Sequence, residues 1–205
     1  MAETPEETRM IEFYLKALDL KDEKRTGWEL RNIEQPESVA SHSWGAAMLC
    51  LMLAEKEELD RQKCVEMALI HDLAEAETGD FATRDIDGKK EVEAEEKEEL
   101  ELAAIKELTE GLDSDKINKL WQEYEDRETP EAEFVKDMDL VDMCLQALKY
   151  EKDERYDPEE ENENFQEYDN LDEFFATSEP RLNTETGKDL FAEIKQRYEE
   201  AKRSK

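Results

Sequence analysis

A small set of polar residues interrupts the most apolar stretches of the chain. His71 and Asp72 break the run MALIHDLA, and Asp139 lies within FVKDMDLVDMCLQAL. The second of the two histidines, His42, opens the stretch HSWGAAMLCLML. Burying an imidazole or a carboxylate costs free energy unless a partner compensates for it. Because neutral imidazole nitrogen and carboxylate oxygen are ligands of divalent transition metals, these four residues are candidate metal ligands.

Each of these residues also has a simpler interpretation. One hydrogen bond can satisfy a buried histidine, an adjacent His-Asp pair recurs by chance, and Asp139 alone could be an exposed helix residue. Together, however, the four residues come from three expected helices and include both histidines, which favours a metal site. Two imidazoles and two carboxylates also leave coordination positions for water and substrate, as a catalytic metal requires.

Apolar residues at helical spacing indicate the elements that must position these groups. Helices are expected at about 6–18, 40–56, 60–77, 89–110, 115–127, 131–150 and 187–203, with Ser38 or Ser41 capping the second. The segment at about 151–186 is acidic and aperiodic, which is typical of a surface loop or a partly ordered excursion. No alternating strand pattern is present. The sequence therefore predicts a single all-α domain over residues 1–205.

Composition narrows the class of protein. The formal charge of -31 argues against nucleic-acid polymers and anionic membrane surfaces as partners, although it is also compatible with a salty cytoplasm. No apolar run is long enough for a membrane span, and the first residues do not resemble a signal peptide. Cys50, Cys64 and Cys144 are unpaired in spacing and lie in apolar patterns, so we expect three core thiols and a reducing, cytoplasmic location.

The spacing of these motifs resembles the HD-domain metal-dependent phosphohydrolases, and in particular their 5′-deoxynucleotidase branch. The resemblance rests on KRTGWELRNIEQPESVASH, ALIHDLAEAETGD and EAEFVKDMDLVDMCLQA and covers residues 8 to 150. It implies an all-α HD-domain helical bundle that binds one divalent ion (Mn, Co, Mg, Zn or Fe) and forms a homodimer. The implied metal ligands are His42, His71, Asp72 and Asp139.

The resemblance also implies catalytic roles for Glu75 and Asp80. Glu75 follows His71 by four residues and shares its helical face, so it could orient or deprotonate a metal-activated water. Asp80, in the loop after this helix, could protonate the leaving 5′ oxygen. The simpler interpretations are a solvated helix glutamate and a turn residue beside Gly79.

An anionic substrate needs local cations in so acidic a chain, because salt screens distant charges beyond about 8–10 Å. The segment KDEKRTGWELR gathers Lys21, Lys24, Arg25 and Arg31. An arginine fork suits phosphate oxygens, although either arginine could instead form an ordinary surface pair. The resemblance suggests that Trp28 stacks on a base or walls off the sugar 2′ position; alternatively it anchors the core. The expected substrate contacts are Arg25, Trp28 and Arg31, with Lys136 as a further candidate.

These features predict a metal-dependent phosphomonoesterase that removes the 5′ phosphate of deoxyribonucleoside monophosphates in one step. Two alternatives remain. The chain could be an HD hydrolase of another nucleotide, cyclic or polyphosphate. It could also be a non-catalytic acidic helical interaction protein with a structural metal.

Overall fold

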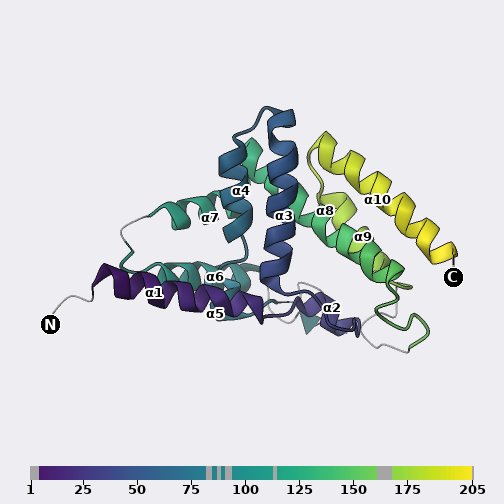
Figure 1. Cartoon of the computed structure of the whole chain (residues 1–205), viewed down its shortest axis with the longest axis horizontal. Helices are drawn as coiled ribbons and strands as arrows, with labels where there is room; N and C mark the ends of the chain where they lie inside the picture. Colours follow the sequence, from purple (N-terminus) through teal and green to yellow (C-terminus); the bar gives the residue numbers. More distant parts are fainter. Residues whose placement is uncertain are drawn as a thin grey trace.

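The structure is a computed structural model that describes residues 5–81, 85–86, 89–90, 94–112, 115–160 and 168–204. Helices dominate this part of the chain (Figure 1), which confirms the predicted all-α class. The α-helices are α1 (Glu6–Ala17), α2 (Thr26–Leu30), α3 (Val39–Leu53), α4 (Arg61–Ile70), α5 (Glu75–Thr78), α6 (Ala94–Leu108), α7 (Lys116–Asp126), α8 (Pro130–Lys152), α9 (Asp172–Ser178) and α10 (Glu185–Arg203). Short 3-10 helices occur at η1 (Leu18–Lys21), η2 (Ala54–Glu57) and η4 (Glu179–Arg181).

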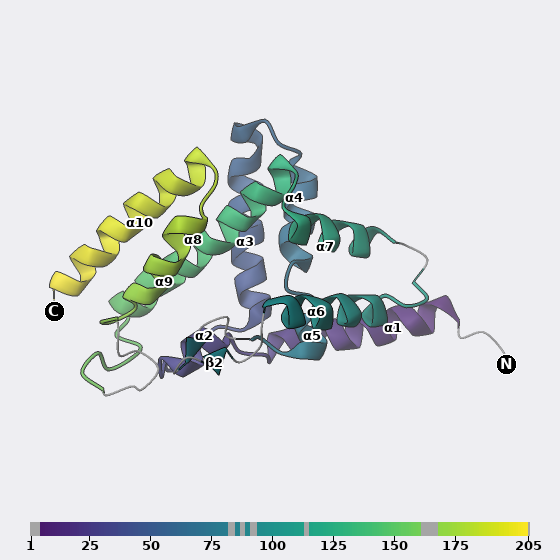
Figure 2. The ribbon, with the colours of Figure 1, turned by 180° about the vertical axis from the view of Figure 1, so that it is seen from behind.

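Helix α8 is the central element of the fold. Its 23 residues include buried side chains on several sides, among them Phe134, Met138, Val141 and Cys144. Helices α3, α4 and α7 pack against it from one side and α9 and α10 from the other (Figures 1 and 2). A helix surrounded in this way must be apolar around much of its circumference, so any polar residue that it buries needs a specific partner.

Side-chain caps fix where the site-bearing helices begin. The Ser38 hydroxyl accepts a hydrogen bond from the backbone of Ser41 and caps α3, so Ser38 is the cap of the two candidates. Asp60 caps α4 in the same way. Thr129 caps α8, and Pro130 occupies its first position, where a missing N–H costs nothing.

The helix expected over residues 60–77 is divided in two. Helix α4 ends at Ile70, residues 71–74 form a turn, and α5 is a single short helix. The imidazole Nδ1 of His71 hydrogen-bonds the carbonyl of Ala68 at 2.8 Å, the carbonyl that an uninterrupted helix would offer to the amide of Asp72. Periodicity misses this break because the apolar spacing continues through it.

The expected start of the helix over 89–110 is also wrong. Residues 89–90 form strand β2, which pairs antiparallel with β1 (Asp85–Ile86), and α6 begins only at Ala94. The charged run before Leu102 contains too few apolar residues to define where a helix starts.

The segment at about 151–186 is not a loop throughout. It contains α9 and η4, and Leu171 and Phe175 are buried in the main core. The Phe175 ring stacks on Tyr198 of α10 at a centroid distance of 4.4 Å. A seven-residue helix carries too few apolar positions for its periodicity to emerge from an acidic background.

The three cysteines are free and buried, which confirms them as core residues. Within the described ranges, none of the helices has both the length and the apolar character needed to cross a bilayer.

A buried carboxylate joins α8 to α10. The Asp137 side chain is fully buried and accepts hydrogen bonds from the amides of Asn183 and Thr184 and from the Thr184 hydroxyl. A Cβ at Gly187 would overlap this carboxylate, so the first turn of α10 can approach Asp137 only with glycine there.

We expect Asp137→Ala to lower the free energy of unfolding by about 3 kcal/mol, because three donors lose a charged acceptor. The measurement is urea unfolding in the presence of chelator. Asp189→Ala, at an exposed position of α10, is the control and should change stability by less than about 0.5 kcal/mol. Equal stability of the Asp137 variant and the wild type would contradict the proposal that Asp137 holds α10 against α8.

Candidate metal centre

The four predicted metal ligands meet where α3, α4 and α8 converge. His42 comes from α3, His71 and Asp72 from the turn after α4, and Asp139 from α8. The Nε2 atom of His42 lies 3.1 Å from Asp139 Oδ1 and 3.8 Å from Asp72 Oδ2. His71 Nε2 lies 3.1 Å from the same Asp72 oxygen. One ligand atom from each of His42, His71 and Asp72 lies within 4.8 Å of the others. Residues 97 positions apart in sequence thus face a common point.

Hydrogen bonds on the outer side of each ring determine which nitrogen faces this point. A carbonyl only accepts, so His71 Nδ1 carries the proton that it donates to Ala68. His71 Nε2 is buried, and no hydrogen-bond donor or acceptor satisfies it among the described residues. His42 Nδ1 lies 2.8 Å from Asp142 Oδ2, which leaves its Nε2 directed at Asp139 and Asp72.

The set of atoms fits a divalent cation. The Nε2 atom of a neutral imidazole and the oxygens of an ionised carboxylate are all hydrogen-bond acceptors. Acceptors about 3 Å apart repel one another unless positive charge lies between them. Imidazole with carboxylate is also a ligand set of divalent transition metals. A single ion coordinated by His42, His71, Asp72 and Asp139 would satisfy the otherwise unpartnered Nε2 of His71.

Without such an ion, a proton on His42 and the neighbouring Arg25 supply the positive charge. Burial and Arg25 lower the pKa of His42, but its hydrogen bonds with Asp139 and Asp142 outweigh them and raise it to about 10. Burial raises the pKa of Asp72, yet His71 and Arg25 hold it well below its usual range. A proton on His42 and a divalent ion are therefore alternative ways of holding the same oxygens together.

The second oxygen of Asp139 is held apart from this point. Lys136 Nζ contacts Asp139 Oδ2 at 2.6 Å, and the Tyr124 hydroxyl donates to the same oxygen at 2.9 Å. Burial raises the pKa of Asp139, but Lys136 and His42 lower it well below its usual range. Lys136 is itself buried, and burial lowers its pKa. Lys136, a candidate substrate contact, thus lies beside the cluster with its amine paired to a candidate ligand.

Glu75 and Asp80 lie close enough to Asp72 and Arg25 to interact with their charges. Glu75 is 4% exposed, and its Oε2 finds no hydrogen-bond partner among the described residues. Burial, Asp72 and Asp80 together raise the pKa of Glu75 well above its usual range. The Asp80 carboxylate accepts from the amide of Thr26 at 2.7 Å, which ties the loop after α5 to the start of α2.

Arg25 is the predicted substrate residue that lies at the cluster. Its Nη1 contacts Asp72 Oδ2 at 2.9 Å, and its Nε lies 3.9 Å from Asp80 Oδ2. The Arg25 side chain is 16% exposed, so it is largely enclosed by the protein. A guanidinium beside a cluster of carboxylates provides a local cation in a strongly acidic protein.

Trp28 and Arg31 lie elsewhere. The Trp28 side chain packs between Phe174 and Tyr150, and its Nε1 donates to Glu37. It is 1% exposed, which matches its alternative interpretation as a core anchor. Arg31 Nε donates to the carbonyl of Asn170 at 2.7 Å. These contacts hold α2 against α8, α9 and the segment before α9.

Two site residues were given no role from sequence. Tyr124 and Asp142 each contact a candidate ligand directly. Asp142 was visible as a polar residue one helical turn after Asp139, and that spacing is the signal that could have assigned it. Tyr124 belongs to the apolar stripe expected over 115–127, and nothing in its sequence context distinguishes it.

The chain is similar in sequence to known proteins. The HD domain family model matches residues 17–178, a match that extends past residue 150 and through α9. The 5′-deoxynucleotidase HDDC2 of Dictyostelium discoideum is 43% identical over 152 residues, which cover 69% of this chain and 77% of that protein. The human 5′-deoxynucleotidase HDDC2 is 37% identical over 145 residues, which cover 69% of this chain and 68% of that protein.

Solved structures resemble the fold over nearly its whole length. A protein of Pyrococcus horikoshii superposes with a TM-score of 0.72 at 30% identity, over 91% of this chain and 99% of that one. A protein of Magnetospirillum magnetotacticum, described as a predicted metal-dependent phosphohydrolase, superposes with a TM-score of 0.66 at 26% identity, over 96% of this chain and 92% of that one.

Adding Co²⁺ or Mn²⁺ to chelator-treated protein should raise Tm, because the ion replaces repulsion among buried acceptors with coordination. At 100 times Kd the expected rise is about 5–10 °C, measured by scanning calorimetry. His71→Ala should lose most of the rise, whereas Asp153→Asn, at an exposed position, should keep it. A wild-type Tm that no divalent ion changes would refute the metal centre.

Proposed function

The chain belongs to the HD domain family, and from this premise we propose that it is a metal-dependent 5′-deoxynucleotidase. It hydrolyses the phosphate ester of deoxyribonucleoside 5′-monophosphates. The observation that carries the proposal is the grouping of His42, His71 and Asp72, whose ligand atoms lie within 4.8 Å of one another, with Asp139 3.1 Å from His42 and Arg25 2.9 Å from Asp72. The relatives called 5′-deoxynucleotidases support the substrate class, since the similarity spans 69% of the chain.

Each group has a role that its surroundings favour. A divalent ion bound by His42, His71, Asp72 and Asp139 would act as a Lewis acid and make a water nucleophilic near neutral pH. Glu75 accepts the proton of the attacking water, a task that suits a buried carboxyl whose pKa is raised above its usual range by burial and Asp72. Asp80, held against α2 by the Thr26 amide, protonates the leaving 5′ oxygen.

Arg25 provides the local positive charge that an anionic substrate needs in a protein of charge -31. Its guanidinium is shared between Asp72 and Asp80 and can turn one edge toward phosphate oxygens while keeping these partners. Only charges within about 8–10 Å act strongly at physiological salt, so this one cation matters more than the distant acidic surface.

The identity of the ion follows from the donor set only in part. Two imidazole ligands favour Mn, Co, Zn or Fe over Mg, which prefers an all-oxygen shell. We also propose a reducing compartment such as the cytoplasm, which the three buried thiols support because none is paired in a disulfide.

Chelator-treated protein supplied with Mn²⁺ or Co²⁺ should release phosphate from deoxyribonucleoside monophosphates. A panel of deoxy, ribo, cyclic and polyphosphate nucleotides, assayed for inorganic phosphate, distinguishes this activity from that of another HD hydrolase. Glu75→Gln should lower kcat by about 10²–10⁴-fold while the bound metal per chain stays unchanged, because the variant loses the proton acceptor.

Glu77→Gln is the matched control, since Glu77 belongs to the same short helix but pairs with Lys16 on α1 at 3.1 Å. It should leave kcat nearly unchanged. Absence of hydrolysis of every monophosphate, or full activity in His71→Ala, would overturn the proposed function.

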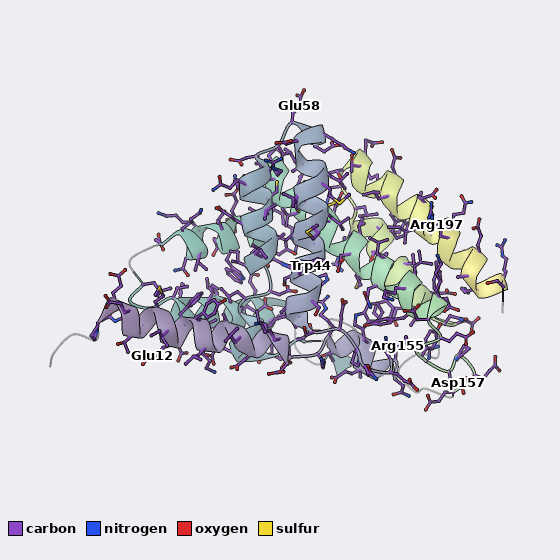
Figure 3. All side chains as sticks on the ribbon, in the orientation of Figure 1. Glu12, Trp44, Glu58, Arg155, Asp157 and Arg197 are labelled. Carbon is purple, nitrogen blue, oxygen red and sulfur yellow. The ribbon has the colours of Figure 1, made fainter. Side chains whose placement is uncertain are left out.

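We further propose that the protein forms a homodimer through the face built by α1 and α3. Exposed on α1 are Met10, Ile11, Tyr14 and Leu15, and on α3 Trp44, Met48, Leu51 and Met52. Both helices lie on the side toward the viewer in Figure 1, where Figure 3 labels Trp44, and on the far side in Figure 2.

Charge makes a second copy the fitting occupant of this face. Two chains of charge -31 repel wherever their acidic surfaces meet, but the 15 residues of α3 include no charged side chain. Four exposed apolar side chains on each of two helices exceed the scattered exposure usual for a monomer, and a stable dimer needs about 800 Å² from each partner.

Trp44→Asp should convert the dimer to a monomer in sedimentation velocity, because two introduced carboxylates would oppose each other across the contact. Leu100→Asp on α6, which lies toward the viewer in Figure 2, is the control and should remain dimeric. A wild-type protein that is monomeric at every concentration tested would refute this interface.

A further inference from the structure

We propose that Asp142 is a positioning residue that orients His42 for the ion, and that Gly45 is required to make room for it. The inference rests on the proposed metal centre and goes beyond its ligand set. It starts from one contact, the 2.8 Å approach of Asp142 Oδ2 to His42 Nδ1.

The ring of His42 is held at both nitrogens by the same helix. Asp139 faces Nε2 at 3.1 Å and Asp142 faces Nδ1 at 2.8 Å, and the two aspartates stand one turn apart on α8. The ring is fully buried, so no water competes for either nitrogen. With Asp142 as acceptor, the proton of a neutral His42 stays on Nδ1, and the lone pair of Nε2 points at the cluster.

Gly45 makes this arrangement sterically feasible. It lies one turn after His42 on α3, on the side that faces α8, and an added Cβ would overlap the Asp142 carboxylate. The carboxylate is an anchored group rather than the loose end of an exposed chain, since its side chain is 16% exposed. Any side chain at position 45 must therefore displace Asp142 or push α3 away from α8.

A neighbouring carboxylate explains why the orientation needs fixing. Glu37, His42 and Asp142 present ligand atoms within 4.8 Å of one another, so His42 Nδ1 has two carboxylates close by. The indole Nε1 of Trp28 donates to Glu37 Oε1 at 2.9 Å, which engages that oxygen elsewhere. Asp142 is left as the acceptor of the His42 proton. Trp28 thus contributes to the order of the site from within the core.

The test measures ion affinity rather than turnover. Chelator-treated protein is titrated with Co²⁺ in a calorimeter. Asp142→Ala should raise Kd about 10–100-fold, the usual effect of removing the partner of a ligating histidine. Asp142→Asn should fall between wild type and the alanine variant, because an amide oxygen accepts the same hydrogen bond without the charge. Asp153→Asn removes one exposed carboxylate just after the end of α8 and should leave Kd unchanged.

A double-mutant cycle tests the role of Gly45. Gly45→Ala alone should weaken Co²⁺ binding as Asp142→Ala does, because the methyl group displaces the carboxylate. Combined with Asp142→Ala, it should cause little further loss, and the double variant should regain Tm relative to Gly45→Ala since the overlap is gone. Additive effects on Kd would show that Gly45 acts independently of Asp142.

Histidine ¹⁵N spectra of the Zn²⁺-loaded protein give a readout that a merely structural role would not change. The chain has two histidines, so two imidazole patterns are expected. His42 should show a protonated Nδ1 in wild type and a changed pattern in Asp142→Ala, while the His71 pattern stays the same. Wild-type Co²⁺ binding with no loss in Asp142→Ala would overturn this inference alone. Absence of binding in wild type would overturn the metal centre instead.

Discussion

The structure depends on one electrostatic constraint, the convergence of four acceptor side chains at a buried point. Two imidazole nitrogens face two carboxylates at about 3 Å, in a region from which bulk water is excluded. Such atoms stay together only with positive charge between them, supplied by protons and Arg25 or by a divalent ion. Helices α3 and α8 and the turn after α4 must therefore be held in register, and buried residues of α3, α4 and α8 all belong to the main apolar core.

The distribution of charge around this point explains how so acidic a chain can act on anions. The cations near the cluster are few, and each contacts a specific carboxylate: Arg25 contacts Asp72, and Lys136 contacts Asp139. The excess of negative charge belongs to helix surfaces that salt screens. Helix α3 carries His42 inside and uncharged, apolar side chains outside, so the metal centre and the proposed dimer face share one element.

The cluster of candidate ligands and the main helices could be located from sequence because both depend on local patterns. Helical periodicity located α3, α7, α8 and α10 closely, and the polar residues that interrupted it are those that meet at the cluster. The divergence of Arg25 and Arg31 could not be predicted in this way. They are six residues apart with the short helix α2 between them, and tertiary contacts to Asp72 and to Asn170 determine where each points. The turn at 71–74 could not be predicted either, because the His71 side chain interrupts the helix there rather than a glycine or proline.

Three aspartates on α8 point in different directions and hold different parts of the molecule. Asp137 holds the start of α10, Asp139 faces the ligand cluster, and Asp142 faces the back of His42. Because the helix is rigid over one and a half turns, α10 cannot detach without uncovering a buried carboxylate two residues from the cluster. Detachment of α10 and disruption of the candidate metal centre should therefore occur together. We expect the chain to unfold as a single cooperative unit rather than fray from its C-terminal end.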